Sequence, residues 1–234
     1  MGLWVTALFD AAAAGVTPEG ETKKLFCHGQ REDGAIILTV LMSPRMSAQK
    51  PATGSALTRE AILAALGSLS EELGKQGIIG EICLFDGTVM VLAFTARLAT
   101  KDVDALFQPA QTIREIARGI ADEQHLPSDW LNDGVKGFVS ARHETTAGNL
   151  PQFQHLRLTM PVPEYLLAMK CMASRVGMVE TEADDVSDII FLIRHLHLNN
   201  AQVVLSLIAD YYPASRVPVK AQYLVESLFA EGKI

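Results

Sequence analysis

The chain has few cysteines and a shortage of positive charge. Its three cysteines, Cys27, Cys83 and Cys171, lie far apart in the sequence and form no CxxC pair. This spacing argues against a disulfide framework and a structural zinc site, and it favours a reducing compartment. The 20 basic and 27 acidic residues give a net charge of −7, so no overall positive field attracts nucleic acid. A nucleotide or RNA partner would therefore need a local cluster of basic side chains.

Long apolar runs are also missing. No segment is apolar over the roughly 20 residues that a membrane-spanning helix needs, so we expect no membrane partner. The apolar stretch at residues 3–9 has no basic segment before it and is interrupted by Asp10, which argues against a secretory signal. Met1, Gly2 and Thr6 match the myristoylation pattern, but a pattern this short often arises by coincidence. We therefore predict a cytoplasmic protein.

Composition divides the chain into three parts. Residues 1–57 are rich in Gly, Pro, Ala and Ser and contain one strand-like run, at residues 35–41, so we expect a poorly ordered extension with room for one short hairpin. Residues 58–160 alternate between helical and strand patterns, and residues 161–234 are almost entirely helical. The predicted fold class is therefore α/β (α+β), with a small mixed-sheet core followed by a C-terminal helical lobe.

Local signals predict the individual elements. Thr58 can cap a helix whose apolar residues recur at helical spacing and which Gly74 ends. Pro163 and Gly177 bracket another helix, and Thr181 begins a capping box for a third, which runs to about residue 196. Further helices are expected at residues 88–97, 110–123, 201–211 and 219–230, and strands at residues 78–85, 100–107 and 155–160.

Two acids stand out in the strand predicted at residues 100–107. Asp102 and Asp104 are two residues apart, so their side chains share one face of the strand while the residues between and after them face the core. Carboxylates so placed can bind one or two Mg²⁺ ions. The helix expected after Gly87 would direct its free N–H groups at the same region, which suits a phosphate. The alternative is an Asp-x-Asp pair that is simply solvated at the end of a strand.

Several segments carry a resemblance to a known family. They are LFDGT at residues 84–88, RLATKDVDALF at residues 97–107, DWLND at residues 129–133, YLLAMK at residues 165–170, and Asp185-x-x-Asp188-Ile189. A hydrophobic-Gly-[Gly/Ser] turn followed after about a dozen residues by Asp-x-Asp resembles the nucleotidyltransferase superfamily, and most closely its AbiEii-like branch in bacterial toxin–antitoxin and abortive-infection systems. The resemblance extends from Thr58 to the C-terminus and leaves residues 1–57 unmatched.

The resemblance implies both a reaction and a site. The reaction is transfer of a nucleoside monophosphate from an NTP to a hydroxyl of RNA or protein, with tRNA among the candidate acceptors. A toxin of this kind would be held in check by a separate antitoxin protein. The implied catalytic residues are Asp102, Asp104 and Lys170, with the two aspartates binding Mg²⁺ or Mn²⁺. The implied nucleotide-binding residues are Gly87, Thr88, Lys170, Arg175, Asp185 and Asp188.

Lys170 is unusual without the family as well. It shares a predicted helical face with Leu166, Leu167 and Ala173, where a charge is out of place. Such a lysine either extends to the rim of the protein or points into a cleft that needs a cation. Arg175 also has two interpretations: it is either a second phosphate contact or an ordinary surface charge.

Two departures from the family pattern keep a second hypothesis open. Asp86 stands where an ungapped match expects the first glycine, and its carboxylate would repel a phosphate unless a metal intervenes. Reading Gly87-Thr88 as the glycine pair preserves the motif. The strand at residues 155–160 lacks the third carboxylate that many nucleotidyltransferases carry, and Asp185 and Asp188 could simply stabilise the first turns of a helix. The alternative hypothesis is a catalytically inactive module that keeps the fold for binding or interaction.

Overall fold

The computed structural model describes residues 28–32, 35–39, 56–174 and 182–234. It divides into two compact units, residues 1–51 and residues 52–234. In the first unit, β1 (His28–Glu32) pairs antiparallel with β2 (Ala35–Thr39), which confirms the short hairpin expected there. The rest of that unit lies outside the described residues, so the predicted poor order of the N-terminal extension stays a prediction.

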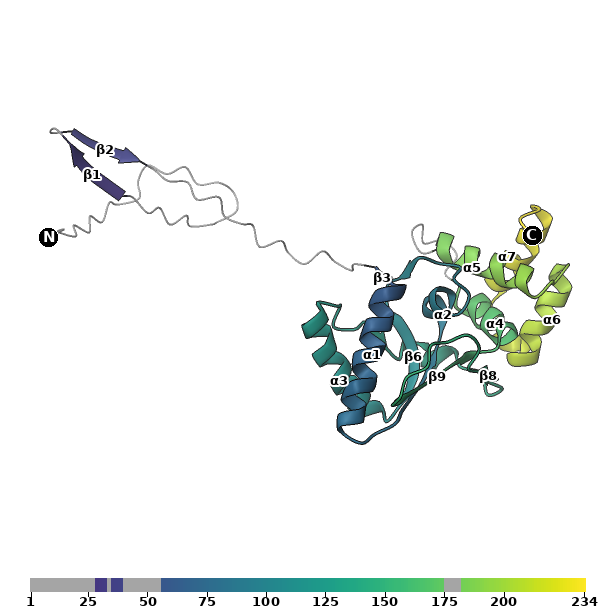
Figure 1. The fold of residues 1–234 in the computed structure, drawn as a ribbon. Helices are drawn as coiled ribbons and strands as arrows, with labels where there is room; N and C mark the ends of the chain where they lie inside the picture. Colours follow the sequence, from purple (N-terminus) through teal and green to yellow (C-terminus); the bar gives the residue numbers. More distant parts are fainter. Residues whose placement is uncertain (1–27, 33–34, 40–55, 175–181) are drawn as a thin grey trace. The chain divides into compact units, whose positions relative to one another are not determined.

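The second unit is built on a five-stranded mixed sheet with the strand order β7-β6-β4-β9-β8. Figure 1 labels its strands β6, β8 and β9. Its strands are β4 (Gly80–Leu84), β6 (Val103–Gln108), β7 (Leu131–Asn132), β8 (Thr145–Thr146) and β9 (Leu156–Pro161). Strand β4 runs antiparallel to β6 and parallel to β9, and β6 runs parallel to β7. A separate antiparallel pair joins β3 (Leu57–Thr58) to β5 (Ala99–Thr100).

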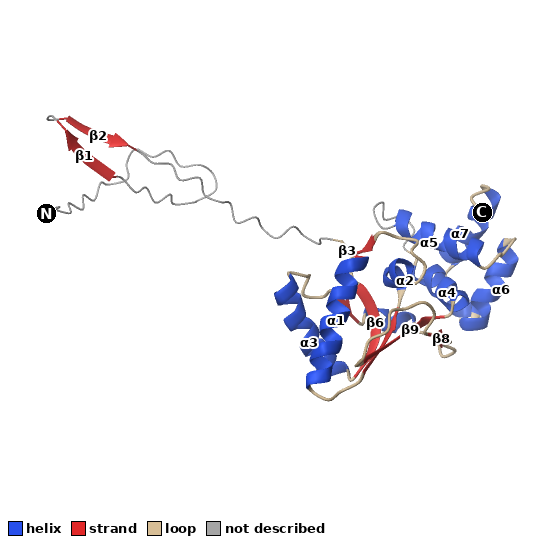
Figure 2. Ribbon diagram, viewed as in Figure 1, coloured by secondary structure: helices blue, strands red, loops and turns tan. Residues whose placement is uncertain are grey.

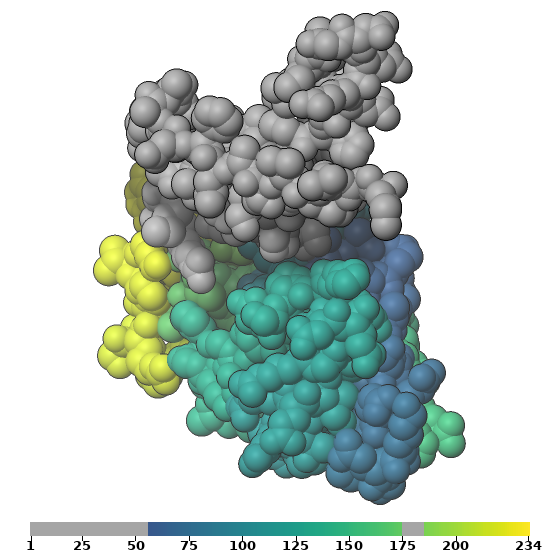
Figure 3. Space-filling view, turned by 90° about the vertical axis from the view of Figure 1, so that its left-hand side faces the viewer, coloured from purple at the N-terminus to yellow at the C-terminus, as the bar shows by residue number. Residues whose placement is uncertain are grey.

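Helices cover one face of this sheet, and the helices of the C-terminal lobe lie beside the sheet (Figure 2). Helices α1 (Arg59–Lys75) and α3 (Ala110–Gln124) pack against each other, and Figure 3 shows α1 in blue beside α3 in teal. The C-terminal lobe consists of α4 (Pro163–Ala173), α5 (Glu182–His195), α6 (Ala201–Tyr211) and α7 (Val219–Ala230). The predicted α/β (α+β) class, a mixed sheet followed by a helical lobe, is confirmed. Within the described ranges, no helix combines the length and apolar character needed to cross a membrane.

Buried and more exposed residues alternate along β6. One face of this strand therefore points to the core, and the opposite face, called the cleft face below, does not. The core residues are Val103, Ala105 and Phe107. On the same face of β4, Gly80 lets α1 and α3 approach closely, because a Cβ there would lie 2.7 Å from Leu73 Cδ1 and 3.4 Å from Ile113 Cδ1. Asp104 is half-buried and lies on the opposite face, since successive residues of a strand point to opposite sides.

The segment between β4 and β6 differs from the prediction. The helix expected at residues 88–97 is the seven-residue α2 (Asp86–Leu92), which begins and ends earlier. Beyond its end, Thr95 adopts the left-handed conformation (φ 53°), which turns the chain away from the helix axis. The strand expected at residues 100–107 is divided into β5 and β6, with Lys101 and Asp102 between them.

Two predicted helix ends were also wrong. Helix α1 continues past Gly74 to Lys75, and the glycine in the left-handed conformation is Gly77 (φ 67°). Gly74 instead serves close packing, because a Cβ there would lie 2.5 Å from the His155 ring. Helix α4 ends at Ala173, before Gly177, and both Gly177 and the predicted capping residue Thr181 lie outside the described residues.

Candidate active site

A cleft of about 550 Å³ lies between the cleft face of the sheet and the helices α2, α4 and α5. Four aspartates and three basic residues line it, together with an apolar wall from α4 and the 3₁₀ helix η1 (Gly134–Phe138). These charged residues are Asp86, Asp102, Asp104, Asp185, Arg97, Lys101 and Lys170. A volume of this size is typical of small-molecule sites.

Asp104 lies in β6 and Asp102 directly precedes this strand, and both residues line the same cleft. Burial and repulsion from Asp86 raise the pKa of Asp102. Burial and repulsion from Asp102 and Asp86 raise the pKa of Asp104 to about 6. Mutually repelling, half-buried carboxylates form a site in which a bound cation would relieve the repulsion.

This pair would supply the donors for the metal ion that the resemblance implies. Among the residues that the structure describes, no group of three or more His, Cys, Asp or Glu side chains is arranged to hold a metal ion. Mg²⁺ usually keeps several waters and binds proteins through one or two carboxylates plus substrate phosphates. Asp102 and Asp104 therefore fit Mg²⁺, or Mn²⁺, as ligands that would share the ion with a bound triphosphate.

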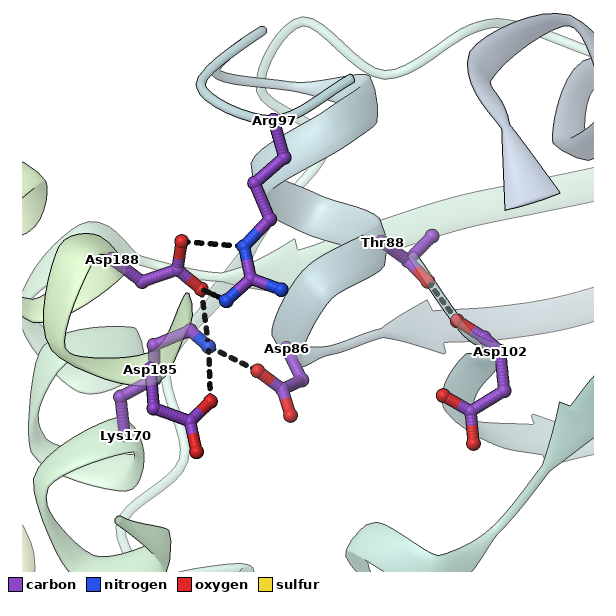
Figure 4. Close-up of polar contacts among 7 residues, drawn as sticks. All are labelled: Asp86, Thr88, Arg97, Asp102, Lys170, Asp185 and Asp188. Carbon is purple, nitrogen blue, oxygen red and sulfur yellow. Dashed lines mark hydrogen bonds and ion pairs between the residues drawn. The ribbon is translucent and has the colours of Figure 1, made fainter. Parts of the chain in front are cut away.

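Lys170 points from α4 into a cluster of three aspartates (Figure 4). Its ammonium is hydrogen-bonded to Asp86 and lies 2.6 Å from Asp188 Oδ2 and 3.8 Å from Asp185 Oδ1. Burial opposes the charge of Lys170, which is only 5% exposed, but attraction to Asp86 and Asp188 raises its pKa. Of the two alternatives, Lys170 therefore points inward, and it stays charged.

Asp188 joins Lys170 to a second cation, Arg97. Arg97 donates from Nε to Asp188 Oδ1 at 2.7 Å, and its Nη2 lies 2.6 Å from Asp188 Oδ2. Such a two-pronged pair holds the guanidinium in a defined plane. Asp188 is 2% exposed and does not line the cleft, so it orients the two cations, whereas Asp185 is half-buried and faces the cleft. Arg97 begins the segment at residues 97–107 that carries the resemblance, but it was given no role because its partner Asp188 lies 91 residues away.

Asp86 begins α2 with a left-handed backbone, at φ 48°. Glycine adopts this conformation without strain, and aspartate is one of the few other residues that tolerate it. A glycine would be unstrained here, and this is the position at which the ungapped match expects the first glycine of the turn. Its carboxylate binds the ammonium of Lys170, the cation that the resemblance assigns to phosphate.

Gly87 and Thr88 serve the packing of α2 against the strands. A Cβ at Gly87 would lie 2.4 Å from Thr100 Oγ1, so only glycine allows this approach. Thr88 is buried, and its Oγ1 donates to the backbone oxygen of Asp102 at 3.1 Å. Gly87 lines the cleft and Thr88 does not. Their phosphate contacts stay predictions, and Arg175 lies outside the described residues.

Asn132 is a cleft residue that the sequence did not single out. It lies on β7, beside Asp104 in the sheet, and its Nδ2 donates to Asp102 Oδ2 at 3.0 Å. The strand at residues 155–160, where a third carboxylate was sought, is β9, which pairs with β4 and not with β6. Strand β7 is only two residues long and shows no alternating pattern, so periodicity could not reveal it.

Comparisons with protein-family models, with curated proteins and with solved structures found no significant match.

Proposed function

We propose that this chain is a Mg²⁺-dependent nucleotidyltransferase, which transfers a nucleoside monophosphate from an NTP to a hydroxyl of RNA or protein. The observation that carries the proposal is the pairing of Asp102 and Asp104 in one cleft, across from the cations Lys170 and Arg97. When bound, a divalent cation would neutralise phosphate charge and favour displacement at phosphorus.

The proposed reaction is a substitution at the α-phosphorus. The hydroxyl oxygen of the acceptor forms a bond to the α-phosphorus, and the bond from that phosphorus to the α,β-bridging oxygen breaks. Pyrophosphate leaves with the electron pair, and the hydroxyl proton passes to water. The protein's part is to place the triphosphate between the carboxylate pair and the Lys170 side of the cleft, because positioning and charge stabilisation dominate this chemistry.

The acceptor and the biological setting belong to the same proposal. The resemblance to the AbiEii-like branch supports tRNA or a protein as the acceptor and an antitoxin protein as a partner. The three widely spaced cysteines support a cytoplasmic location.

Labelled NTP tests the proposal directly. The variants Asp102→Ala and Asp104→Ala should each lower NMP transfer to a total RNA and protein extract by about 100-fold or more, because loss of metal-borne charge stabilisation costs several kcal/mol. Asp122→Ala, an exposed change on α3, is the matched control and should transfer as the wild type does. Full activity in either cleft variant would refute the site.

A second candidate function is a catalytically inactive binding module, and the Asp86–Lys170 bond favours it. A carboxylate on Lys170 competes with a phosphate for the same cation. Titration of NTPs with and without Mg²⁺ separates the two candidates. If the wild type binds no NTP while Asp86→Gly does, the inactive module is supported, and if both bind with Mg²⁺, the enzyme is supported.

A further inference from the structure

We propose that Asn132 is a positioning residue for the metal site, whose amide N–H holds the Asp102 carboxylate in place for a divalent cation. The inference rests on the proposed function, because it assumes that Asp102 and Asp104 bind the cation.

The orientation of the Asn132 amide is determined by two opposite contacts. Its Oδ1 accepts a hydrogen bond from the Gly134 backbone N–H at 2.9 Å, and its Nδ2 donates to Asp102 Oδ2 at 3.0 Å. A backbone N–H can only donate, so the oxygen of the amide must face Gly134 and the NH₂ group must face Asp102. The turn at Gly134 therefore aims a donor at the carboxylate.

Gly134 keeps this arrangement compact. A Cβ at position 134 would lie 3.0 Å from Asn132 Oδ1 and 3.7 Å from Asp104 Oδ1. The Asn132 amide and the Asp104 carboxylate are thus both neighbours of the same glycine. The two acids and the amide form one group at the edge of the sheet.

The backbone beneath Asn132 is anchored in the core. Trp130, two residues earlier, is fully buried, and its Nε1 donates to the Ala117 backbone oxygen of α3 at 3.0 Å. The Trp130 backbone oxygen accepts from the Val103 N–H at 2.6 Å, which joins β7 to β6. Asn132 is therefore held by a rigid support on the side away from the cleft.

The hydrogen bond to one oxygen of Asp102 explains how Asn132 would act on a bound cation. A carboxylate that is held through one oxygen can still coordinate an ion through the other. Partners that orient metal-ligating carboxylates typically change metal affinity by 10–100-fold when they are removed. Asn132 is such a partner of Asp102. Its loss should weaken binding of the ion, although both carboxylate ligands remain.

Titration of the full chain with Mn²⁺, followed by electron paramagnetic resonance, tests the inference. Asn132→Ala should weaken Mn²⁺ binding by about tenfold or more. Asn132→Ser, which keeps a side-chain oxygen for the Gly134 turn but cannot reach Asp102, should weaken it similarly. Asn149→Ala, an exposed change in the loop before β9, is the matched control and should bind Mn²⁺ as the wild type does.

A double variant separates positioning from a general loss of structure. If Asn132 acts through Asp102, the variant Asp102→Ala/Asn132→Ala should bind Mn²⁺ no more weakly than Asp102→Ala alone. Additive losses, or wild-type affinity in Asn132→Ala, would overturn the inference while leaving the proposed function intact. If the variants bind Mn²⁺ as expected but the wild type transfers no NMP, only the proposed function would be overturned. If the wild type binds no Mn²⁺, both the inference and the proposed function would be overturned.

Discussion

Charge balance among single residues decides what the cleft can bind. Four aspartates face the cleft against three basic side chains, and the ammonium of Lys170 is already bonded to Asp86. A triphosphate would meet excess negative charge, which the proposed divalent cation would offset. In the proposed function, Asp102 and Asp104 are the residues that would bind this cation.

The raised pKa of Asp104 predicts a pH-dependent effect of its removal. The pKa is about 6 in the folded protein, against 3.8 for the ordinary group, so the ionised carboxylate destabilises the fold above pH 6. This destabilisation is relieved as the pH falls from 6 to 3.8. Asp104→Asn should therefore raise the free energy of unfolding by about 1 kcal/mol at pH 7, a value reduced for solvent screening in an open cleft, and by almost nothing near pH 4.

Urea unfolding without divalent cations, at pH 4, 5, 6 and 7, measures this difference. The exposed Asp122→Asn on α3 serves as the control and should show no such trend. If Asp104→Asn raises the free energy of unfolding equally at every pH, the raised pKa of Asp104 would be contradicted.

At the scale of elements, the short helix α2 connects both sides of the cleft. It carries Asp86 at its first position, packs on β5 through Gly87, and bonds through Thr88 to the backbone of Asp102. A shift of α2 would therefore move the partner of Lys170 and the start of β6 together. Its position depends on the close approach at Gly87.

Two glycines in helices should respond to alanine in opposite directions. Gly87→Ala places a Cβ 2.4 Å from Thr100 Oγ1, and overpacking of this kind should destabilise the protein by about 1–3 kcal/mol. Gly119→Ala on α3 meets no atom within 4 Å and should stabilise it by about 1 kcal/mol through helix propensity. Thermal unfolding monitored by circular dichroism measures both changes, and a stable Gly87→Ala would show that α2 can move away from β5 without cost.

For the second unit as a whole, the segment after η1 joins the sheet to the helical lobe. Tyr212 Oη donates to the Phe138 backbone oxygen at 2.6 Å, and the Ser140 backbone N–H donates to Tyr165 Oη at 2.8 Å. Phe138 also lines the cleft, so the docking of the lobe determines the shape of the apolar wall. We expect the sheet and the lobe to unfold together because these bonds and the Lys170 cluster connect them.

Tyr212→Phe tests this connection. It removes the hydrogen bond to the Phe138 oxygen and leaves that oxygen without this donor, so the free energy of unfolding should fall by about 1–2 kcal/mol. Tyr223→Phe, at a side chain that is 71% exposed, should have almost no effect. Urea unfolding followed by both tryptophan fluorescence and circular dichroism measures the change, and two separate transitions in the wild type would contradict a single cooperative unit.

The sequence alone determined features that depend on neighbours along the chain. The helices predicted near residues 201–211 and 219–230 coincide with α6 and α7, because the apolar spacing of a helix depends on neighbours along the chain. The placement of Asp102 and Asp104 in one cleft is local in the same way, since the two acids are only two residues apart where β6 begins.

Only the tertiary structure decided which side chains meet. Lys170 bonds to Asp86, 84 residues away, and Arg97 bonds to Asp188, 91 residues away. The contact of Asn132 with Asp102 spans 30 residues and depends on a two-residue strand. Periodicity reports which face of an element is buried, but the partner on that face depends on how distant elements pack. The carboxylate pair was therefore predictable from sequence, whereas the residues that surround and orient it were not.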